Sequence, residues 1–234
     1  RRVSGDFYDV FELPGGYAGF AIGDVCDKGA GAALFMALTR SLIRIFSGQA
    51  QLSRSPINME SQTVGGRPEP GSIRQYTQLD AIRTIALTND YLAFNNDMCM
   101  FVTLFFGVLD PETGKLLYIN CGHEIVSVID ANGIKERLVQ TGPAVGLIPH
   151  ATFKYKEIQL EPGEILYSFT DGVTDARSPG EERFTRKRLV SLLSQPAETV
   201  FELMQRIGTS LFAHIGKAPQ ADDITMLALQ RKIQ

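Results

Sequence analysis

The sequence predicts an α+β fold in which helices cover stacked antiparallel sheets. Short apolar runs separated by glycine-containing turns indicate β-hairpins. Longer segments with apolar residues three or four positions apart indicate amphipathic helices. The helices are segregated from the hairpins along the chain, which favours antiparallel sheets covered by helices over a parallel sheet.

The turn residues place four hairpins, because each turn contains glycine together with proline or asparagine. The paired strands are Val10–Leu13 with Tyr17–Ile22, Phe101–Leu109 with Lys115–Cys121, Glu124–Ile129 with Gly133–Leu138, and Phe153–Leu160 with Ile165–Thr170. A last strand is expected over Ile224–Gln230. Helices are expected over Gly31–Phe46, from Leu79 to near Asn95, over Arg186–Leu193 and over Glu198–Ile215.

Residues 47–78 differ from the rest of the chain. They are rich in Ser, Gln, Gly, Pro and Arg and contain few large apolar side chains. We interpret them as a flexible insertion, with room for short helical pieces, inside a single domain over residues 1–234. The chain begins Arg1-Arg2-Val3 and enters a carboxylate motif at once. We therefore expect a domain that is cut at its N-terminus from a longer chain.

The composition argues against several classes of protein. The 234 residues are 44% hydrophobic and 21% charged, and the formal net charge is −3. Such a chain lacks the basic field that nucleic acid attracts. No apolar stretch is expected to approach the roughly 20 residues that span a bilayer, so membrane insertion is not expected. The three cysteines form no CxxC pair, which favours a reducing compartment and hence the cytoplasm.

Four short carboxylate clusters lie beside a glycine or at the end of an apolar run. They are Ser4–Asp9, Ile22–Gly29, Phe169–Asp175 and Ala221–Thr225. Asp24 and Asp171 leave predicted strands, Asp222 enters one, and Asp6 lies just before the first. A carboxylate beside a buried strand is costly to desolvate without a positive partner, and Lys28 is the sole basic residue in these motifs. Oxygen ligands without His or Cys suit Mg²⁺ or Mn²⁺, so we expect a bound divalent cation.

The number of carboxylates favours two ions over one, because a single Mg²⁺ usually takes only one or two carboxylates. Two ions can generate hydroxide and orient a phosphate for in-line attack. The alternative is that these are turn residues, since aspartate beside glycine often hydrogen-bonds its own backbone. That alternative applies most to Asp9, Asp27, Asp175 and Asp223, which could also be outer partners or hold a weak third ion.

Other catalytic systems find little support. The three histidines lie in no HExxH or Cys/His ligand spacing, and no serine lies in a GxSxG setting. His123 follows a predicted strand and could donate a proton, although a turn histidine bonded to backbone is the more common case. Cys26 lies close to the carboxylates, but a small core residue is the more common interpretation.

These motifs resemble those of the metal-dependent PPM-type serine/threonine phosphatases, in the bacterial SpoIIE/RsbU-like branch. The resemblance covers nearly the whole chain. It rests on the order of Gly5–Asp9, Ile22–Gly29, Met100–Phe105, Cys121–His123, Tyr167–Ala176 and Asp222–Thr225. The sequence departs from the family at Glu124-Ile125-Val126, where a Gly-His-x-Pro-Pro pattern is common, and at Phe184-Thr185, where Phe-Gly is frequent.

The resemblance implies an α-β-β-α sandwich with two Mn²⁺ or Mg²⁺ ions in a cleft at one end. It places Asp6 and Asp24 at the metal pair, with Asp24 bridging. The backbone carbonyl of Val25 is a further ligand, and Asp171 and Asp222 complete one shell. A metal-activated water would then attack a phosphoserine or phosphothreonine directly.

The resemblance also implies partners. The expected substrate is a phosphorylated anti-sigma-factor antagonist of the STAS type, with a sensory domain upstream in the full chain. Residues 40–80 would couple the binding of a partner or sensor to metal occupancy. Two alternatives remain: a catalytically inactive signalling module of the same fold that binds a regulator, and a two-metal hydrolase for small phosphoesters or nucleic acid. The acidic balance disfavours nucleic acid, whose phosphates need Lys and Arg.

Overall fold

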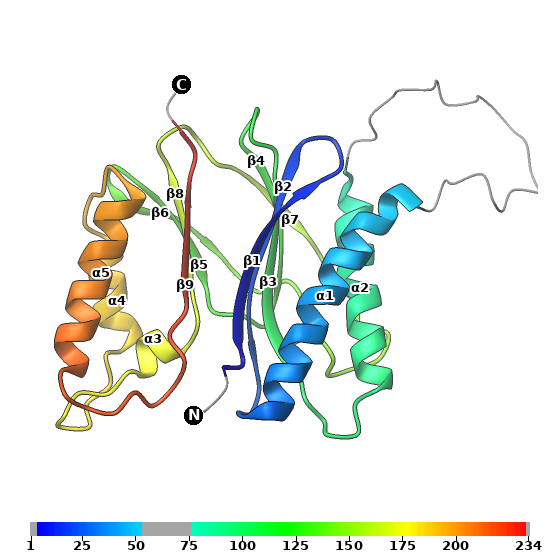
Figure 1. Ribbon diagram of the computed structural model, residues 1–234. Helices are drawn as coiled ribbons and strands as arrows, with labels where there is room; N and C mark the ends of the chain where they lie inside the picture. The colour runs from blue at the N-terminus through cyan, green and yellow to red at the C-terminus, as the bar shows by residue number, and fades with distance from the viewer. Residues whose placement is uncertain (1–3, 53–75, 233–234) are drawn as a thin grey trace, which may run out of the picture.

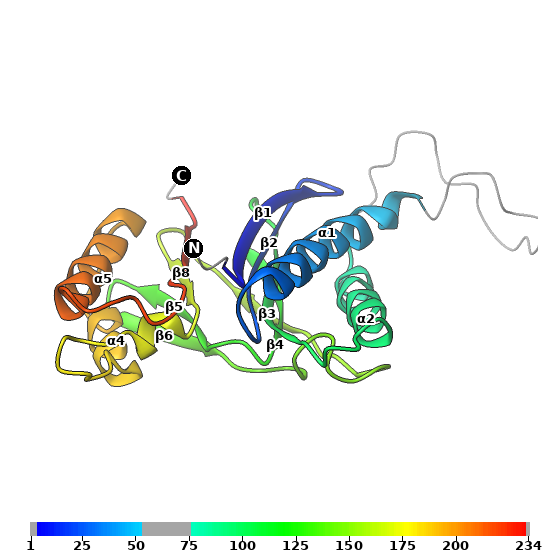
Figure 2. The same cartoon turned by 60° about the horizontal axis from the view of Figure 1, so that its bottom comes forward.

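Two antiparallel sheets pack face to face, with helices on the outer side of each (Figure 1). This computed structural model describes residues 4–52 and 76–232. Figure 2 shows α1 and α2 outside one sheet and α4 and α5 outside the other. The prediction of an α+β fold and an α-β-β-α sandwich is confirmed.

The first sheet has the strand order β1-β2-β3-β4-β7, and the second has the order β6-β5-β8-β9. The strands of the first sheet are β1 (Asp6–Leu13), β2 (Tyr17–Val25), β3 (Val102–Leu109), β4 (Lys115–Cys121) and β7 (Lys156–Gln159). Those of the second are β5 (Val126–Asp130), β6 (Gly133–Leu138), β8 (Ile165–Phe169) and β9 (Met226–Gln230). The helices are α1 (Ala30–Leu52), α2 (Gln78–Phe94), α3 (Gly172–Asp175), α4 (Arg186–Leu193) and α5 (Val200–Ile215).

Three layers of apolar side chains hold the sandwich together. Phe106 and Ile85 belong to the layer between the first sheet and its helices, and Tyr167 and Leu203 to the layer between the second sheet and its helices. The middle layer lies between the sheets, where Phe105 stacks between Phe20 and Tyr118 at centroid distances of 6.1 and 5.5 Å. Each such buried side chain contributes roughly 1.5–3 kcal/mol, so the sheets are fixed against each other.

Three of the four predicted hairpins form, but the pairing of Phe153–Leu160 with Ile165–Thr170 is wrong. β7 pairs with β4 in the first sheet, and β8 pairs with β5 and β9 in the second. The chain crosses between the sheets at residues 161–164, where buried Glu164 forms an ion pair with Lys135. The turn residues located the turn correctly, but they carry no information on which sheet each strand joins.

The predicted insertion at 47–78 is partly helical. α1 continues to Leu52, and α2 begins at Gln78. The hydroxyl of Thr77 accepts a hydrogen bond from the Asp80 amide while the Asp80 carboxylate accepts from Thr77, which forms a capping box. Residues 53–75 lie outside the described part of the chain.

Helix α1 contains a longer apolar stretch than the sequence analysis expected. Among the described residues, one helical stretch, Ala30–Gly48, has the length and the apolar composition of a membrane span. Length and composition are the only criteria that it meets. The expectation that no stretch approaches this length therefore does not hold for α1. In the fold it packs against α2 and β1, and two of its arginines reach a buried carboxylate.

Candidate functional site

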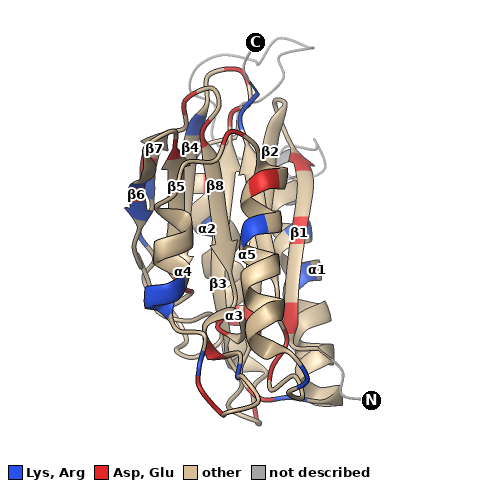
Figure 3. Cartoon of the chain, turned by 90° about the vertical axis from the view of Figure 1, so that its left-hand side faces the viewer, with Lys and Arg blue, Asp and Glu red and all other residues tan. Residues whose placement is uncertain are grey.

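The four aspartates predicted as ligands lie at one end of the sandwich. Asp6 begins β1 and is the register partner of Asp24 near the end of β2, so Asp6 lies inside the strand and not before it. Asp171 follows β8, and Asp222 lies in the segment that leads into β9, the antiparallel neighbour of β8. Figure 3 shows acidic residues in red at this end, near α3 and the start of β1.

A threonine that the sequence analysis did not single out connects the two sheets at this point. Buried Thr170 donates from its hydroxyl to Oδ2 of Asp6 at 2.6 Å. The same hydroxyl accepts the backbone N–H of Thr225 at 3.1 Å. Thr170 thus fixes the Asp6 carboxylate from the opposite sheet. In the sequence, the feature that could have indicated this role is the position of Thr170, a polar residue between a buried strand and Asp171.

Gly172 allows the two acidic loops of the second sheet to meet. A Cβ on Gly172 would lie 1.8 Å from the backbone oxygen of Asp223 and 3.5 Å from the Cβ of Asp222. Only glycine fits such an approach, because real Cβ atoms do not come that close to backbone. The contact brings α3, which follows Asp171, against the segment that carries Asp222.

The carboxylates repel one another. Burial, followed by the negative charges of Asp6, Asp171 and Asp222, raises the pKa of Asp24 to about 8. Burial also raises the pKa of Asp6, although the hydroxyl of Thr170 acts in the opposite direction. The pKa of Asp171 is raised by burial and then by the charge of Asp222. Positive charge at this end of the molecule would relieve these interactions.

One ammonium group already meets this cluster. The Nζ of Lys28 lies 2.7 Å from Oδ1 of Asp222 and donates to the backbone oxygen of Ala221 at 3.0 Å. Lys28 lies in the loop between β2 and α1, within the same Ile22–Gly29 motif as Asp24. Its charge works against the raised pKa of Asp171.

The remaining aspartates of the motifs have partners within the protein. Asp9 is buried and accepts hydrogen bonds from Arg40 and Arg44 of α1. Asp175 pairs with Arg183. Asp223 accepts the backbone N–H of Gly5 at 3.2 Å, and Asp27 accepts the N–H of Lys28 at 2.7 Å. The motifs themselves contain no arginine, so they gave no sign of the partners of Asp9, which lie on a helix thirty-one and thirty-five positions away.

Neither His123 nor Cys26 has the setting of a proton donor. Burial lowers the pKa of His123 to about 4, so the imidazole is neutral near pH 7. The Nδ1 of His123 lies 3.2 Å from the hydroxyl of Thr103, and its backbone N–H donates to Asn120. The Sγ of Cys26 accepts the N–H of Phe101 at 3.0 Å.

The residues at this end fit a divalent cation by their chemistry. Among the described residues, no three His, Cys, Asp or Glu side chains converge tightly enough to form a ready-made metal shell. Asp24 nevertheless feels the charges of three other aspartates. Gly5 lies against the carbonyl of Val25, because a Cβ on Gly5 would lie only 3.1 Å from that oxygen. Such an all-oxygen donor set with unbalanced negative charge matches Mg²⁺ or Mn²⁺.

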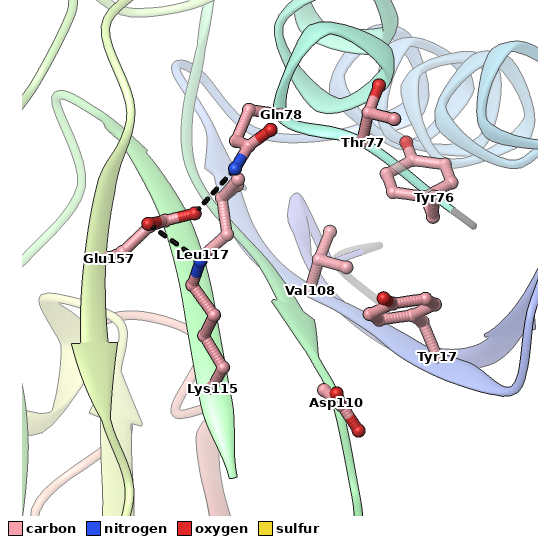
Figure 4. A pocket seen from close by; sticks show the side chains of 9 residues that line it. All are labelled: Tyr17, Tyr76, Thr77, Gln78, Val108, Asp110, Lys115, Leu117 and Glu157. Carbon is pink, nitrogen blue, oxygen red and sulfur yellow. Dashed lines mark hydrogen bonds and ion pairs between the residues drawn. The ribbon is translucent and has the colours of Figure 1, made fainter. Parts of the chain in front are cut away.

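A separate small cavity lies at the opposite end of the first sheet, near the start of β2 and of α2. Its volume is about 90 Å³. Figure 4 shows Glu157 between Lys115 and Gln78, to which it is joined by an ion pair of 3.0 Å and a hydrogen bond of 2.9 Å. None of the four predicted ligands lines this cavity. It therefore does not belong to the acidic end.

The two stacked sheets and their flanking helices form the fold of the PP2C-type phosphatase domains. The chain is similar in structure to the SiaA-PP2C domain of Pseudomonas aeruginosa, with a TM-score of 0.72, 21% identity and coverage of 97% of this chain and 80% of that one. It is also similar to RsbX in complex with magnesium, with a TM-score of 0.60, 15% identity and coverage of 97% and 86%. PP2C-type phosphatases are metal-dependent enzymes. The chain belongs to the SpoIIE family, because the family described as stage II sporulation protein E matches residues 14–232.

Two relatives extend beyond this chain. Protein IcfG of Synechocystis sp. is 48% identical over 235 residues, which are 99% of this chain and 36% of IcfG. Phosphoserine phosphatase RsbU of Bacillus subtilis is 23% identical over 236 residues, which are 100% of this chain and 61% of RsbU. The chain thus spans about a third to three fifths of the length of these relatives.

Proposed function

We propose that this domain is a Mn²⁺- or Mg²⁺-dependent phosphatase that hydrolyses phosphoserine or phosphothreonine in a protein. The observation that supports it most is the gathering of Asp6, Asp24, Asp171 and Asp222 at one end of the sandwich. There the pKa of Asp24 is raised to about 8 by burial and by the other three charges. Membership of the SpoIIE family and the relative named a phosphoserine phosphatase agree with it.

In this proposal two ions are held by five groups of the chain. Asp24 would be the central ligand, the Val25 carbonyl would add one ligand, and Asp6, Asp171 and Asp222 would complete the set. Bound ions would supply an activated water and neutralise charge on the phosphoryl oxygens. RsbX, a structural neighbour, is described in complex with magnesium. Asp175 is left outside the set, because it already pairs with Arg183.

The chain's own residues orient the reacting groups. Thr170 holds the Asp6 carboxylate in one direction, and Gly172 holds the Asp171 and Asp222 segments together. We do not assign His123 as the acid, because burial lowers the pKa of its imidazole to about 4. Protonation of the departing serine oxygen therefore falls to water at the site.

The substrate that we propose is a phosphorylated antagonist of an anti-sigma factor, of the STAS type, acted on in the cytoplasm. RsbU and RsbP of Bacillus subtilis, both named phosphoserine phosphatases, are 23% and 25% identical to this chain. A similar Mycobacterium tuberculosis structure contains RsbU and RsbW domains. Because this chain spans only 36% of IcfG, we propose that a sensory domain precedes it in the full protein.

Hydrolysis assays test the proposal. Release of phosphate from a phosphoserine protein and from p-nitrophenyl phosphate is measured with Mn²⁺ and with EDTA, for wild type, Asp171→Asn and Asp130→Asn. Asp130 lies at the turn between β5 and β6, outside the acidic end, and serves as the control. We expect activity that needs Mn²⁺, falls at least about a hundredfold in Asp171→Asn and is retained in Asp130→Asn.

Each alternative predicts a different result. A wild-type protein that stays inert with Mn²⁺ would support the inactive signalling module. A preference for nucleotides over the phosphoprotein would support a hydrolase for small phosphoesters. Equal activity in Asp171→Asn and wild type would remove Asp171 from the site.

A further inference from the structure

Lys28 connects two segments of the acidic end that lie far apart in sequence. Its Nζ is 2.7 Å from Oδ1 of Asp222 and 3.0 Å from the backbone oxygen of Ala221, a residue 193 positions away. The side chains of Lys28 and Asp222 are 40% and 37% exposed, so the pair lies at the rim and not in the core. The ammonium therefore has room to move away from the carboxylate.

The Asp222 carboxylate has limited capacity for another positive partner. Its Oδ1 accepts the backbone N–H of Asp223 at 2.8 Å as well as the ammonium of Lys28. A divalent ion on either oxygen of this carboxylate would lie only a few ångströms from the ammonium. Two positive charges at such a separation repel each other, and the repulsion grows with the charge of the ion.

The lysine side chain suits a reversible contact. Its ammonium is a compact charge on a flexible four-carbon stem, and it has no fixed fork that would bind both oxygens at once. The loop that carries Lys28 begins directly after Asp24 and Val25 at the end of β2, so the ammonium stays near the site after it leaves Asp222.

We propose that Lys28 is an internal counter-ion that competes with the divalent cation for Asp222. The ammonium neutralises Asp222 and joins the segment before β9 to the loop after β2 when no cation is bound. Cation binding displaces the ammonium from the carboxylate, and loss of the cation lets it return. The inference rests on the proposed function, because it takes Asp222 to be a metal ligand.

Mn²⁺ titration calorimetry on EDTA-treated, then dialysed protein tests the competition. The variants are Lys28→Met, Lys28→Arg and Lys187→Met, the last removing an equal charge from an exposed position on α4. We expect Lys28→Met to bind Mn²⁺ about fivefold more tightly, which corresponds to the roughly 1 kcal/mol of a half-exposed ion pair. Lys28→Arg and Lys187→Met should stay near the wild-type affinity.

Thermal unfolding gives a second readout that needs no activity. In EDTA, Lys28→Met should melt about 2 °C below wild type, because the contact between the two segments is lost. In saturating Mn²⁺ this difference should vanish or reverse, whereas Lys187→Met should match wild type in both conditions.

The outcomes separate the two proposals. Mn²⁺ affinity that is unchanged or weaker in Lys28→Met would overturn the competition, because it would make Lys28 neutral or supportive toward the ion. A wild-type protein that binds no Mn²⁺ would instead overturn the proposed function, whatever the lysine does.

Discussion

At the scale of single residues, Thr170 orients the carboxylate of Asp6, a role that its position in the sequence did not indicate. Its hydroxyl is 2.6 Å from Oδ2 of Asp6 and spans the gap between the sheets. Thr170→Val keeps the shape but removes the donor, which should cost about 1–2 kcal/mol of stability. It should also weaken Mn²⁺ binding by roughly tenfold or more, as loss of an outer partner usually does.

The matched variant is Thr170→Ser, which keeps the hydroxyl. Calorimetric Mn²⁺ titration and thermal unfolding should place Thr170→Ser near wild type and Thr170→Val well below it. If both variants bind Mn²⁺ alike, the hydrogen bond to Asp6 has no part in ordering the site.

Asp9, a carboxylate of the same motif as Asp6, is neutralised by arginines of the protein itself. Burial raises its pKa, but hydrogen bonds from Arg44 and Arg40 outweigh that effect, so the pKa of Asp9 lies below its usual value of 3.8. A lowered pKa in the folded state adds stability above the pKa of the unfolded chain, and this stability is lost as the pH falls through the folded value.

Asp9→Asn should therefore lower the free energy of unfolding at pH 7 by about 1.5–2 kcal/mol, since it weakens the charged hydrogen bonds to two half-exposed arginines. The loss should shrink below pH 4. Urea unfolding between pH 2.5 and 7 measures both, and Asp97→Asn on an exposed loop is the control. A deficit that is constant across the whole pH range would contradict the ion-pair explanation.

At the scale of elements, the contact between α3 and the segment before β9 decides whether two carboxylates meet. Gly172→Ala would place a methyl group 1.8 Å from the Asp223 backbone oxygen, so one of the two segments must move. We expect a loss of about 1–3 kcal/mol in stability and a marked loss of Mn²⁺ affinity.

Gly180→Ala is the matched control, because a Cβ there would meet its nearest neighbour, the hydroxyl of Ser178, at 3.7 Å. Thermal unfolding should show it within about 0.5 kcal/mol of wild type. Should Gly172→Ala melt and bind Mn²⁺ like Gly180→Ala, the close approach is not what brings the loops together.

Elements defined by local pattern were predictable, and their long-range partners were not. The helices, most strands and the placement of Asp24 and Asp171 at strand ends follow from periodicity and turn residues. The pairing of β7 with β4 does not, because a turn such as Glu161–Glu164 has the same residues whether it closes a hairpin or crosses between sheets.

Local pattern likewise predicted only part of the candidate site. Asp6, Asp24, Asp171 and Asp222 were visible as acidic clusters, whereas Thr170 and Gly172 matter only through contacts with residues more than fifty positions away. Arg40 and Arg44 likewise became partners of Asp9 only once α1 packed on β1. Tertiary contact, and not local pattern, gives these residues their roles.

At the scale of the whole molecule, two sheets bring four segments of the chain to one end. β1 and β2 deliver Asp6 and Asp24, while β8 and β9 deliver Asp171 and Asp222. The stacked aromatic layer between the sheets fixes their separation. The rigid sandwich thereby holds like charges together that would otherwise move apart in solvent.

A crystal soaked in Mn²⁺ and measured at the manganese absorption edge tests this account most directly. We predict two anomalous peaks beside Asp24, about 3.5–4 Å apart, within coordinating distance of Asp6, Val25, Asp171 and Asp222. Peaks elsewhere on the molecule, or none in a crystal that diffracts well, would contradict the assignment of this end as a metal centre.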